Sequence, residues 1–212
     1  FCTTKRSKYP KNIIMARIKT EKNGSRKDVI VRKAATLFRE KGYKAASMRD
    51  LAEAVGVEAA SLYNHIKSKS ELLHELVFNV ANRFVLKIDE IESEQISSLK
   101  KMEKILRFHI VEMIHHYEEV YVSDREWKHL SDPYLSNYQN QRRVYRKRLA
   151  AIIEEGIRNK EIKQIDAPTV VLIFLHAVSG IESWHRSTKK ISAEELEQNM
   201  VAILIDGLKA NS

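Results

Sequence analysis

Apolar residues recur at spacings of three and four along most of the chain, which is the period of helices that bury one face. The pattern predicts a first helix over about 26–41, followed by Gly42 at the position of a left-handed C-cap. Two short helices follow, over 48–55 and about 59–66, and Gly56 separates them. The N-terminal part therefore reads as three compact helices.

Serine followed three residues later by an acid marks the start of several helices, because the two side chains satisfy free backbone N–H groups there. A long fourth helix starts in this way after Ser68 and keeps an apolar stripe for about 20 residues. The pattern occurs at Ser25 with Asp28, Ser47 with Asp50, Ser68 with Glu71 and Ser192 with Glu195.

Further helical periods fill the second half of the chain. A fifth helix is expected over 99–114, and another over 138–157. Between them lies a broken region at 118–134, for which we predict one short helix around Trp127.

The stretch TVVLIFLHAVSGIESWHR at 169–186 is apolar around most of its circumference. Asp166 as N-cap and Pro168 in the first turn mark its start. The surface helix of a monomer would expose this apolar surface to water, so the helix requires a partner surface. With a last helix over 193–208 and no strand pattern, the sequence predicts an all-α protein.

Composition agrees with a folded helical protein. Of 212 residues, 43% are hydrophobic, 31% are charged, six are glycine and three are proline. The sequence shows no apolar run that approaches the ~20 residues of a membrane span, so no membrane partner is expected. Cys2 is the only cysteine, which fits a reducing compartment such as the cytoplasm. The chain starts with Phe, Met15 is a plausible initiator, and residues 1–24 are expected to form a flexible extension.

Charge is distributed unevenly along the chain. Residues 1–72 hold 17 basic and 7 acidic residues, whereas residues 73–212 hold 20 basic and 21 acidic residues. A small basic part beside a near-neutral larger part suggests a polyanion partner, with nucleic acid the first candidate. The alternative is a solvated basic surface without a partner.

The stretch VGVEAASLYNHIKSK at 55–69 combines many polar side-chain tips with little apolar surface. Two short helices joined at Gly56 form a helix-turn-helix pattern, in which the second short helix enters the major groove of DNA. Only Leu62 and Ile66 are needed for the core, so the other side chains are free to meet phosphates and base edges. Short helix pairs also occur in proteins that do not bind DNA, and spacing alone leaves that alternative open.

The run GYKAASMRDLAEAVGVEAASLYNHIKSKSELL resembles the N-terminal domain of the tetracycline-repressor (TetR) family, and the resemblance covers residues 26–75. It implies a helix-turn-helix domain over 25–70 in which Tyr63, His65 and Lys69 contact the DNA backbone. The DNA-binding residues that it implies are Ser47, Met48, Arg49, Ala59, Ala60, Ser61, Tyr63, Asn64, His65 and Lys69.

Within this set the resemblance implies different roles. Ser47 or Met48 lies near the sugar-phosphate backbone, and Arg49 reaches a guanine edge. Ala59 and Ala60 stand at the start of the recognition helix, where apolar contact with thymine methyl groups is the expected readout. The alternatives are a partly buried Tyr63, a His65 that only packs and a solvated Lys67.

For residues 71–212 the resemblance implies a domain that binds a small-molecule inducer and dimerises through its last two helices. The apolar 169–186 helix supports a homodimer independently, since Ala177 and Gly180 permit close approach. A symmetric dimer places two recognition helices ~34 Å apart, one turn of a palindromic double-stranded DNA operator.

A set of aromatic and apolar side chains with a few polar groups is expected to face an interior cavity suited to a hydrophobic ligand. The alternative for each is ordinary core. The chain over about 125–187 is also similar to TetR-type regulators of fatty-acid and sterol catabolism, which respond to acyl-CoA thioesters. That similarity implies that Arg142, Arg143 and Tyr145 meet the phosphate-rich end of the ligand, unless QRRVYRKR is only a solvated basic face. The predicted ligand-binding residues are His109, Met113, His116, Tyr117, Trp127, Arg142, Tyr145, Phe174 and Trp184.

Motifs for other functions are missing from the sequence. His109, His115 and His116 have no carboxylate at metal-ligand spacing, so neither a metal nor a cofactor is expected. No phosphate-binding loop, nucleophile elbow, HExxH helix or dinucleotide fingerprint occurs, which argues against an enzyme with catalytic residues. The sequence predicts a repressor that a ligand releases from DNA; the alternative is a helical ligand-binding protein whose helix-turn-helix no longer reads DNA.

Overall fold

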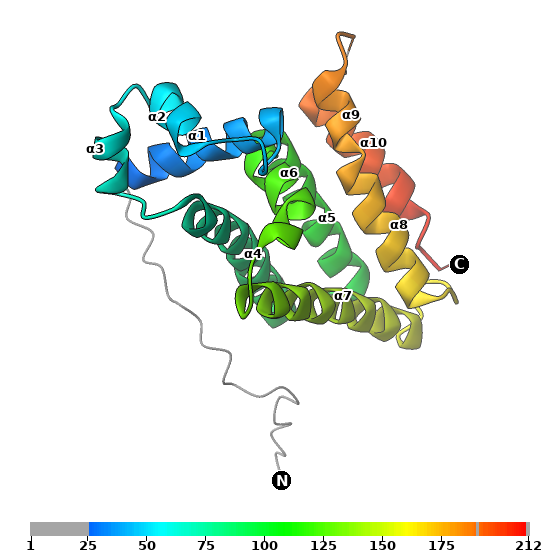
Figure 1. The fold of residues 1–212 in the computed structure, drawn as a ribbon. Helices are drawn as coiled ribbons and strands as arrows, with labels where there is room; N and C mark the ends of the chain where they lie inside the picture. Colours follow the sequence, from blue (N-terminus) through cyan, green and yellow to red (C-terminus); the bar gives the residue numbers. More distant parts are fainter. Residues whose placement is uncertain (1–25, 190, 211–212) are drawn as a thin grey trace.

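A computed structural model of the chain describes residues 26–189 and 191–210 (Figure 1). These residues form helices, with no strand in the described part and one isolated antiparallel bridge near the C-terminus. The all-α prediction is confirmed. The expected extension at 1–24 and the predicted cap at Ser25 lie outside the described residues.

The N-terminal helices begin and end where their caps place them. The Asp50 N–H donates to Ser47 Oγ (3.1 Å) while the Ser47 N–H donates to the Asp50 carboxylate (2.8 Å), which is the predicted capping box. Gly42 and Gly56 have φ values of 78° and 76°, a left-handed conformation that glycine adopts without strain. The four helices are α1 (Arg26–Lys41), α2 (Met48–Val55), α3 (Ala59–Tyr63) and α4 (Lys69–Ser93).

Helix α3 ends earlier than predicted, at Tyr63. The N–H of Asn64 donates to the Ser61 carbonyl (3.3 Å), a spacing of three residues that tightens the last turn. Ile66 is nevertheless fully buried, as Leu62 is, and its N–H reaches the Leu62 carbonyl at 3.1 Å. The two apolar side chains therefore hold α3 and the residues after it against α1, α2 and α4, even though the helix ends between them.

The rest of the chain forms a bundle in which α5 lies centrally, α7 crosses the end of α4, and α8 to α10 form one side (Figure 1). Its elements are α5 (Ser98–His115), α6 (Tyr117–Arg125), the 3₁₀ turn η1 (Trp127–His129), α7 (Tyr134–Arg158), α8 (Ala167–Ser179), α9 (Ile181–Arg186), α10 (Ala193–Val201) and the π-helical η2 (Ala202–Asp206).

The region at 118–134 contains more helix than the sequence predicted. Helix α6 precedes Trp127, and Trp127 itself begins only the 3₁₀ turn η1. Glu118 and Glu119 lie in the first turn of α6, where the helix dipole favours negative charge, and Val122 is buried. The sequence pattern missed α6 because no side chain caps its start and its apolar residues do not form one regular stripe.

The apolar stretch predicted as one helix is divided at Gly180, which keeps right-handed helical angles (φ −63°, ψ −17°). Contrary to the expectation from composition, Ala167–Arg186 is long and apolar enough to span a membrane by length and composition alone. In the fold, however, α8 packs against α5 and α7, and its inner side chains belong to the bundle core. Core helices pass the same length and composition test, so this stretch is weak evidence for a membrane span.

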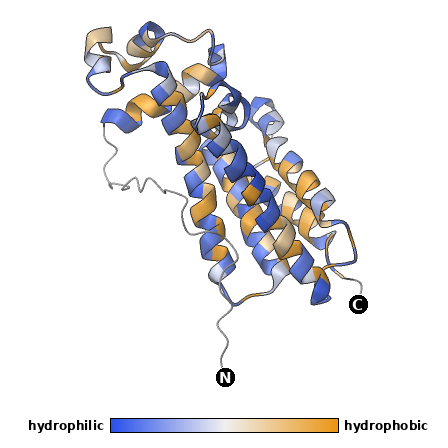
Figure 2. Ribbon diagram, turned by 60° about the horizontal axis from the view of Figure 1, so that its bottom comes forward, coloured by the Kyte–Doolittle hydropathy of each residue, from blue (hydrophilic) through white to orange (hydrophobic). Residues whose placement is uncertain are grey.

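Two hydrophobic clusters share the long helix α4. The first joins α1, α2 and α3 to the N-terminal half of α4. It also includes Val122 of α6, Leu130 directly after η1, and Tyr138 of α7. The second fills the bundle between the C-terminal half of α4, α5, α7 and α8. Figure 2 shows the apolar residues alternating with polar ones along these helices. Helices α1, α2 and α3, which we call the head, are therefore packed directly on the bundle, through α4 and α6.

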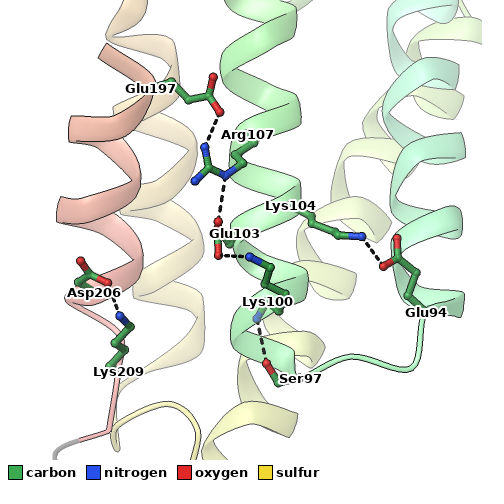
Figure 3. A network of polar contacts seen from close by, with 9 residues as sticks. All are labelled: Glu94, Ser97, Lys100, Glu103, Lys104, Arg107, Glu197, Asp206 and Lys209. Carbon is green, nitrogen blue, oxygen red and sulfur yellow. Dashed lines mark hydrogen bonds and ion pairs between the residues drawn. The ribbon is translucent and has the colours of Figure 1, made fainter. Parts of the chain in front are cut away.

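Ion pairs fasten α10 to the centre of the bundle. The Arg107 guanidinium of α5 contacts Glu197 of α10 at 2.6 Å and Glu103 of its own helix at 2.9 Å (Figure 3). Nearby, Lys104 of α5 pairs with Glu94 at the end of α4 (2.5 Å). Exposed pairs of this kind add little stability each. The contact between Arg107 and Glu197 nevertheless fixes how α10 lies on α5.

Candidate nucleic-acid interface and ligand cavity

The outer surface of α3 offers side chains that the fold does not use. Leu62 and Ile66 occupy the core, whereas Tyr63 is 52% exposed, and His65 is exposed too. Neither Tyr63 nor His65 makes a side-chain hydrogen bond or ion pair to any described residue. The exposed residues of this segment are Ala59, Ala60, Tyr63, Asn64 and His65, with Ser61 half-buried. The tips on α3 are thus available for an external partner.

At the start of α2, most of the predicted DNA-binding side chains are held by contacts within the protein. The Ser47 hydroxyl donates to the Asp50 carboxylate (2.5 Å), and Lys41 pairs with the same carboxylate at 2.7 Å. Hydrogen bonds from Lys41 and then Ser47 lower the pKa of Asp50, so this carboxylate is ionised at neutral pH. Met48 is half-buried against the head cluster, and Arg49 is exposed. Of these predicted DNA-binding residues, Arg49 is the one that extends freely from the helix.

Lys69 has a role that the sequence did not reveal. Its ammonium donates to the carbonyls of Tyr43 (2.9 Å), Ala46 (2.8 Å) and Lys44 (3.3 Å). It also lies 4.6 Å from the centre of the Tyr43 ring, a cation–π contact. All three donors of Lys69 are thus used to tie the start of α4 to the loop between α1 and α2.

Other cations of the head remain unpaired. The side chains of Lys44, Arg49 and Lys67 have no ion pair or hydrogen bond to a residue in the described ranges. Lys27 and Lys41, by contrast, are neutralised by carboxylates at 2.8 and 2.7 Å. The positive charge available to a polyanion therefore includes the tips of the α1–α2 loop, α2 and the segment after α3.

A cavity of about 300 Å³ lies inside the bundle, and its wall is formed by side chains of α4, α5, α6, α7, α8 and α9. This volume is at the low end of the range for small-molecule sites, ~300–1,000 Å³. Four of the nine predicted ligand-binding residues line it, namely His109, Met113, Arg142 and Tyr145. Apolar side chains of α4, such as Val80 and Phe84, line it too.

The deepest polar pair of the cavity is uncharged at neutral pH. His109 Nε2 and the Tyr145 hydroxyl are 2.8 Å apart. Burial lowers the pKa of His109 to about 3 and raises the pKa of Tyr145 above its usual value. The Phe84 ring meets the imidazole edge-to-face at 4.7 Å. The interior therefore suits an apolar group with neutral polar substituents rather than an ion.

Charged groups gather at the rim of the cavity. Arg142 pairs with Asp124 at 2.9 Å, and Arg125 pairs with Glu182 of α9. Arg146 also lines the cavity, is exposed, and has no partner among the described residues. The sequence reasoning missed Arg146, although its position four residues after Arg142 on one helix would have placed both on the same face.

Five predicted ligand-binding residues lie outside the cavity wall, and four of them support the surrounding structure. Three of them make ring contacts: Tyr117 stacks on His185 (4.1 Å between ring centres), Phe174 packs against His109 (5.4 Å), and Trp127 packs against Tyr138 (5.9 Å). Trp184 Nε1 donates to the Ile191 carbonyl (2.9 Å). His116 is the exception, because it is exposed between α5 and α6. Arg143 points away as well, donating to Asn140 (2.8 Å). Periodicity identified buried aromatic residues but not which of them border empty space.

Metal ligands are not assembled in the described ranges, where no group of three His, Cys, Asp or Glu side chains has the geometry to hold an ion. His109, His115 and His116 diverge, because the first is buried while the other two are exposed. These three histidines therefore do not converge on one site.

Helices α8 and α10 leave apolar side chains in solvent. Leu172 is 58% exposed and Ile173 is 54% exposed on α8, and Ile203 is 72% exposed in η2, directly after α10. Large apolar side chains that are exposed on neighbouring helices mark a surface for another protein. These three residues define what we call the apolar edge of the bundle.

Comparisons with known proteins agree with this arrangement. The family model "Bacterial regulatory proteins, tetR family" matches residues 30–76. The model "Tetracyclin repressor-like, C-terminal domain" matches residues 95–208, more than half of the chain.

Individual relatives extend over nearly the whole chain. The chain is 26% identical over 186 residues to the HTH-type transcriptional repressor KstR2 of Mycolicibacterium smegmatis, covering 87% of this chain and 91% of that protein. The ketosteroid transcriptional regulator KstR2 of Mycobacterium tuberculosis has a TM-score of 0.82 at 23% identity, covering 89% of this chain and 97% of that one. The structure of AibR in complex with isovaleryl coenzyme A and operator DNA has a TM-score of 0.75 at 21% identity, covering 85% and 98%. These structural likenesses show a shared fold.

Proposed function

The chain belongs to the tetR family of bacterial regulatory proteins and is a DNA-binding transcriptional regulator, and from that premise we propose how it works. We propose a homodimeric repressor that occupies a palindromic operator until a small hydrophobic ligand, an acyl-CoA thioester, enters the bundle. The protein acts in the cytoplasm and performs no catalysis. One observation carries this proposal. The same chain combines exposed side chains on and after α3, which have no partner among the described residues, with a cavity that α6 connects to the head.

DNA reading is assigned to α3 and the residue at the start of α2. Tyr63 and His65 contact phosphates, since they are exposed and have no described partner. Arg49 reaches a guanine edge, and the methyl groups of Ala59 and Ala60 face thymine. Lys69 orients this surface by holding the α1–α2 loop, which uses all of its donors. Lys67 and Lys44, which have no described partner, therefore supply the phosphate contacts in its place.

Helix α6 is the element that joins ligand and DNA. Several of its residues line the cavity, while α6 also packs against both α1 and α4. The lining residues are Val120, Tyr121, Ser123, Asp124 and Arg125. A ligand that binds better to one position of α6 than to another shifts the head with it, since linkage requires only differential affinity. Displacement of α1 and α4 then alters the separation of the two recognition helices in the dimer.

The chemistry of the cavity supports a thioester ligand. Its interior is largely apolar and carries the neutral pair His109 and Tyr145, whereas cations lie at the rim. A coenzyme A thioester is larger than this cavity, so we place its acyl group inside and its phosphates outside, against Arg146. The names of two similar proteins support this assignment: one relative is a regulator named for ketosteroids, and AibR, which has the same fold, was crystallised with isovaleryl coenzyme A.

The first test is selection of binding sites from random duplex DNA with the wild-type protein and a Tyr63→Ala, His65→Ala double variant. Both changed side chains are exposed, so the variant should fold, which circular dichroism checks. A palindrome enriched by the wild type alone is the expected result. Adding octanoyl-CoA should then release the selected DNA. Failure of the folded wild-type protein to enrich any sequence would favour a ligand-binding protein whose helix-turn-helix does not read DNA.

A further inference from the structure

Gln141 stands apart from the other buried polar side chains of residues 26–189 and 191–210. Four side chains there have a fully buried nitrogen or oxygen atom without a hydrogen bond: Arg39, Glu75, Arg83 and Gln141. The first three nevertheless have an ion pair, Arg39 with Glu40 (3.1 Å), Glu75 with Lys27 (2.8 Å) and Arg83 with Glu112 (3.0 Å). Gln141 has no side-chain partner of any kind among the described residues. Because most buried polar groups in proteins are hydrogen-bonded, an amide left alone requires an explanation.

The position of Gln141 supplies one, because its side chain lines the cavity. It lies on α7 between Tyr138 and Tyr145, which line the same cavity. The hydroxyls of both tyrosines are occupied, since Tyr138 donates to the Ser123 carbonyl (2.9 Å) and Tyr145 meets His109 (2.8 Å). Gln141 Oε1 is therefore a buried acceptor beside this wall that no described group satisfies, and the side chain must turn to present it to a ligand.

We propose that Gln141 is a specificity-determining residue, which selects ligands that carry a hydroxyl or amide N–H donor on the group enclosed in the cavity. The inference rests on the proposed function and narrows its ligand from any acyl-CoA thioester to one with a polar substituent on its acyl group. A plain hydrocarbon chain leaves the buried Oε1 atom of Gln141 unpaired, whereas a donor at the right place satisfies it. Sites built to hydrogen-bond a hydroxyl reject analogues that lack it more strongly than apolar sites reject a change of size.

The test compares octanoyl-CoA with two hydroxyoctanoyl-CoA thioesters, one hydroxylated at mid-chain and one at the chain end, by titration calorimetry. The wild type should bind one hydroxylated thioester about tenfold more tightly than octanoyl-CoA. Gln141→Met keeps the length of the side chain but removes its hydrogen-bonding groups, and it should abolish this preference while binding octanoyl-CoA at least as well. The matched control is Gln139→Met, the same change two residues away at an exposed position of α7, which should behave like the wild type.

Each outcome has a separate meaning. If the wild type binds all three thioesters equally, or if Gln141→Met keeps the preference, the role of Gln141 is overturned while the acyl-CoA ligand stands. If no thioester binds although the protein still binds its operator, the proposed ligand class fails and this inference with it. Thermal unfolding should show Gln141→Met at least as stable as the wild type without ligand, because an unpaired amide has been removed. Should that variant misfold, Gln141→Asn retains an amide but withdraws it from the cavity and should also weaken the preference.

Discussion

Lys67 and Lys69 are two positions apart, yet they have different surroundings. The Lys69 ammonium holds three loop carbonyls, whereas that of Lys67 has no described partner. We expect Lys69→Met to lower the free energy of unfolding by about 1–3 kcal/mol, because loop carbonyls lose their donor. Lys67→Met should change it by less than about 0.5 kcal/mol, as is usual for surface substitutions.

Urea unfolding measures both values, and salt titration of operator binding separates the two roles. Lys67→Met should lower the slope of log affinity against log salt by about one unit, as expected on loss of one phosphate contact. Equal stability of the two variants would contradict the structural role of Lys69.

His109 makes the stability of the bundle depend on pH. Its pKa is lowered to about 3 from the ordinary value of 6.5, so the unfolded chain takes up the proton more readily than the folded one. The free energy of unfolding should therefore be unaffected by this group above pH 7 and fall as the pH drops from 6.5 toward 3. The expected loss approaches about 1.4 kcal/mol per pH unit.

A His109→Phe, Tyr145→Phe double variant tests this assignment, because it replaces both members of the hydrogen bond by apolar groups of similar shape. Urea unfolding at pH 7 and pH 5 should show that the variant loses about 2 kcal/mol less than the wild type over this interval. His74 and other titrating groups are common to both proteins and cancel in the difference. An identical pH dependence would show that His109 is not the buried neutral group responsible.

At this scale the sequence was informative where a role depends on neighbours along the chain. The Ser47 capping box and the burial of Leu62 and Ile66 follow from spacing within one or two turns. The role of Lys69 depends on carbonyls more than 20 positions away, at Tyr43 and Ala46, and no local pattern carries that information. The open amide of Gln141 is likewise visible only once every neighbour has been paired.

Among the elements, the turn η1 makes a further contact between the bundle and the head, in addition to those of α4 and α6. The His129 ring stacks on Tyr43 (5.4 Å between centres, 17° between planes), and His129 Nε2 is 3.3 Å from Glu126. Tyr43 in turn is the residue whose carbonyl and ring bind Lys69. The stack thus connects the end of α6 to the loop that precedes α2.

We expect His129→Ala to weaken the release of operator by octanoyl-CoA about threefold to tenfold, which corresponds to part of a typical coupling free energy. Operator affinity without ligand and affinity for the thioester should both change little, since His129 lies neither on α3 nor in the cavity wall. Fluorescence anisotropy of labelled operator, with and without thioester, gives the ratio. His115→Ala is the control, because His115 is exposed and has no partner among the described residues. Release that is unchanged in His129→Ala would exclude this route.

Elements were predictable where side-chain caps or a long apolar period mark them. The long periods of α4, α5 and α7 carry many apolar positions, and their predicted extents agree with the structure within a few residues. Helix α6 was missed, and it is the element that borders both the cavity and the head. Its polar sequence YEEVYVSDR faces partners on several sides, so burial does not produce one regular stripe.

For the whole molecule, the head and the apolar edge serve different functions in the proposed repressor: the head reads DNA, and the apolar edge joins two subunits. The predicted basic surplus lies in the N-terminal part, where Lys44, Arg49 and Lys67 have no ion pair to any residue that the structure describes. A single head offers one recognition helix, which reads only half of a palindrome. Two heads must therefore be held at a fixed spacing, and the apolar edge on the opposite side of the bundle is the surface suited to do so.

Ile203→Glu and Leu172→Glu should convert the dimer into a monomer, because a charge placed in an apolar interface is desolvated without a partner. Both residues are largely exposed in the single chain, at 72% and 58%, so the substitutions should leave the fold of each subunit intact. Sedimentation equilibrium measures the mass, and operator affinity should fall with it, since each head would bind its half-site alone.

Leu86→Glu provides the matched control, for Leu86 is 60% exposed but lies on α4, away from the apolar edge. It should remain dimeric and bind operator like the wild type. Dimers that persist in both Ile203→Glu and Leu172→Glu would place the interface elsewhere. A monomer that retains full operator affinity would instead separate dimerisation from DNA reading and remove the reason for a fixed spacing between heads.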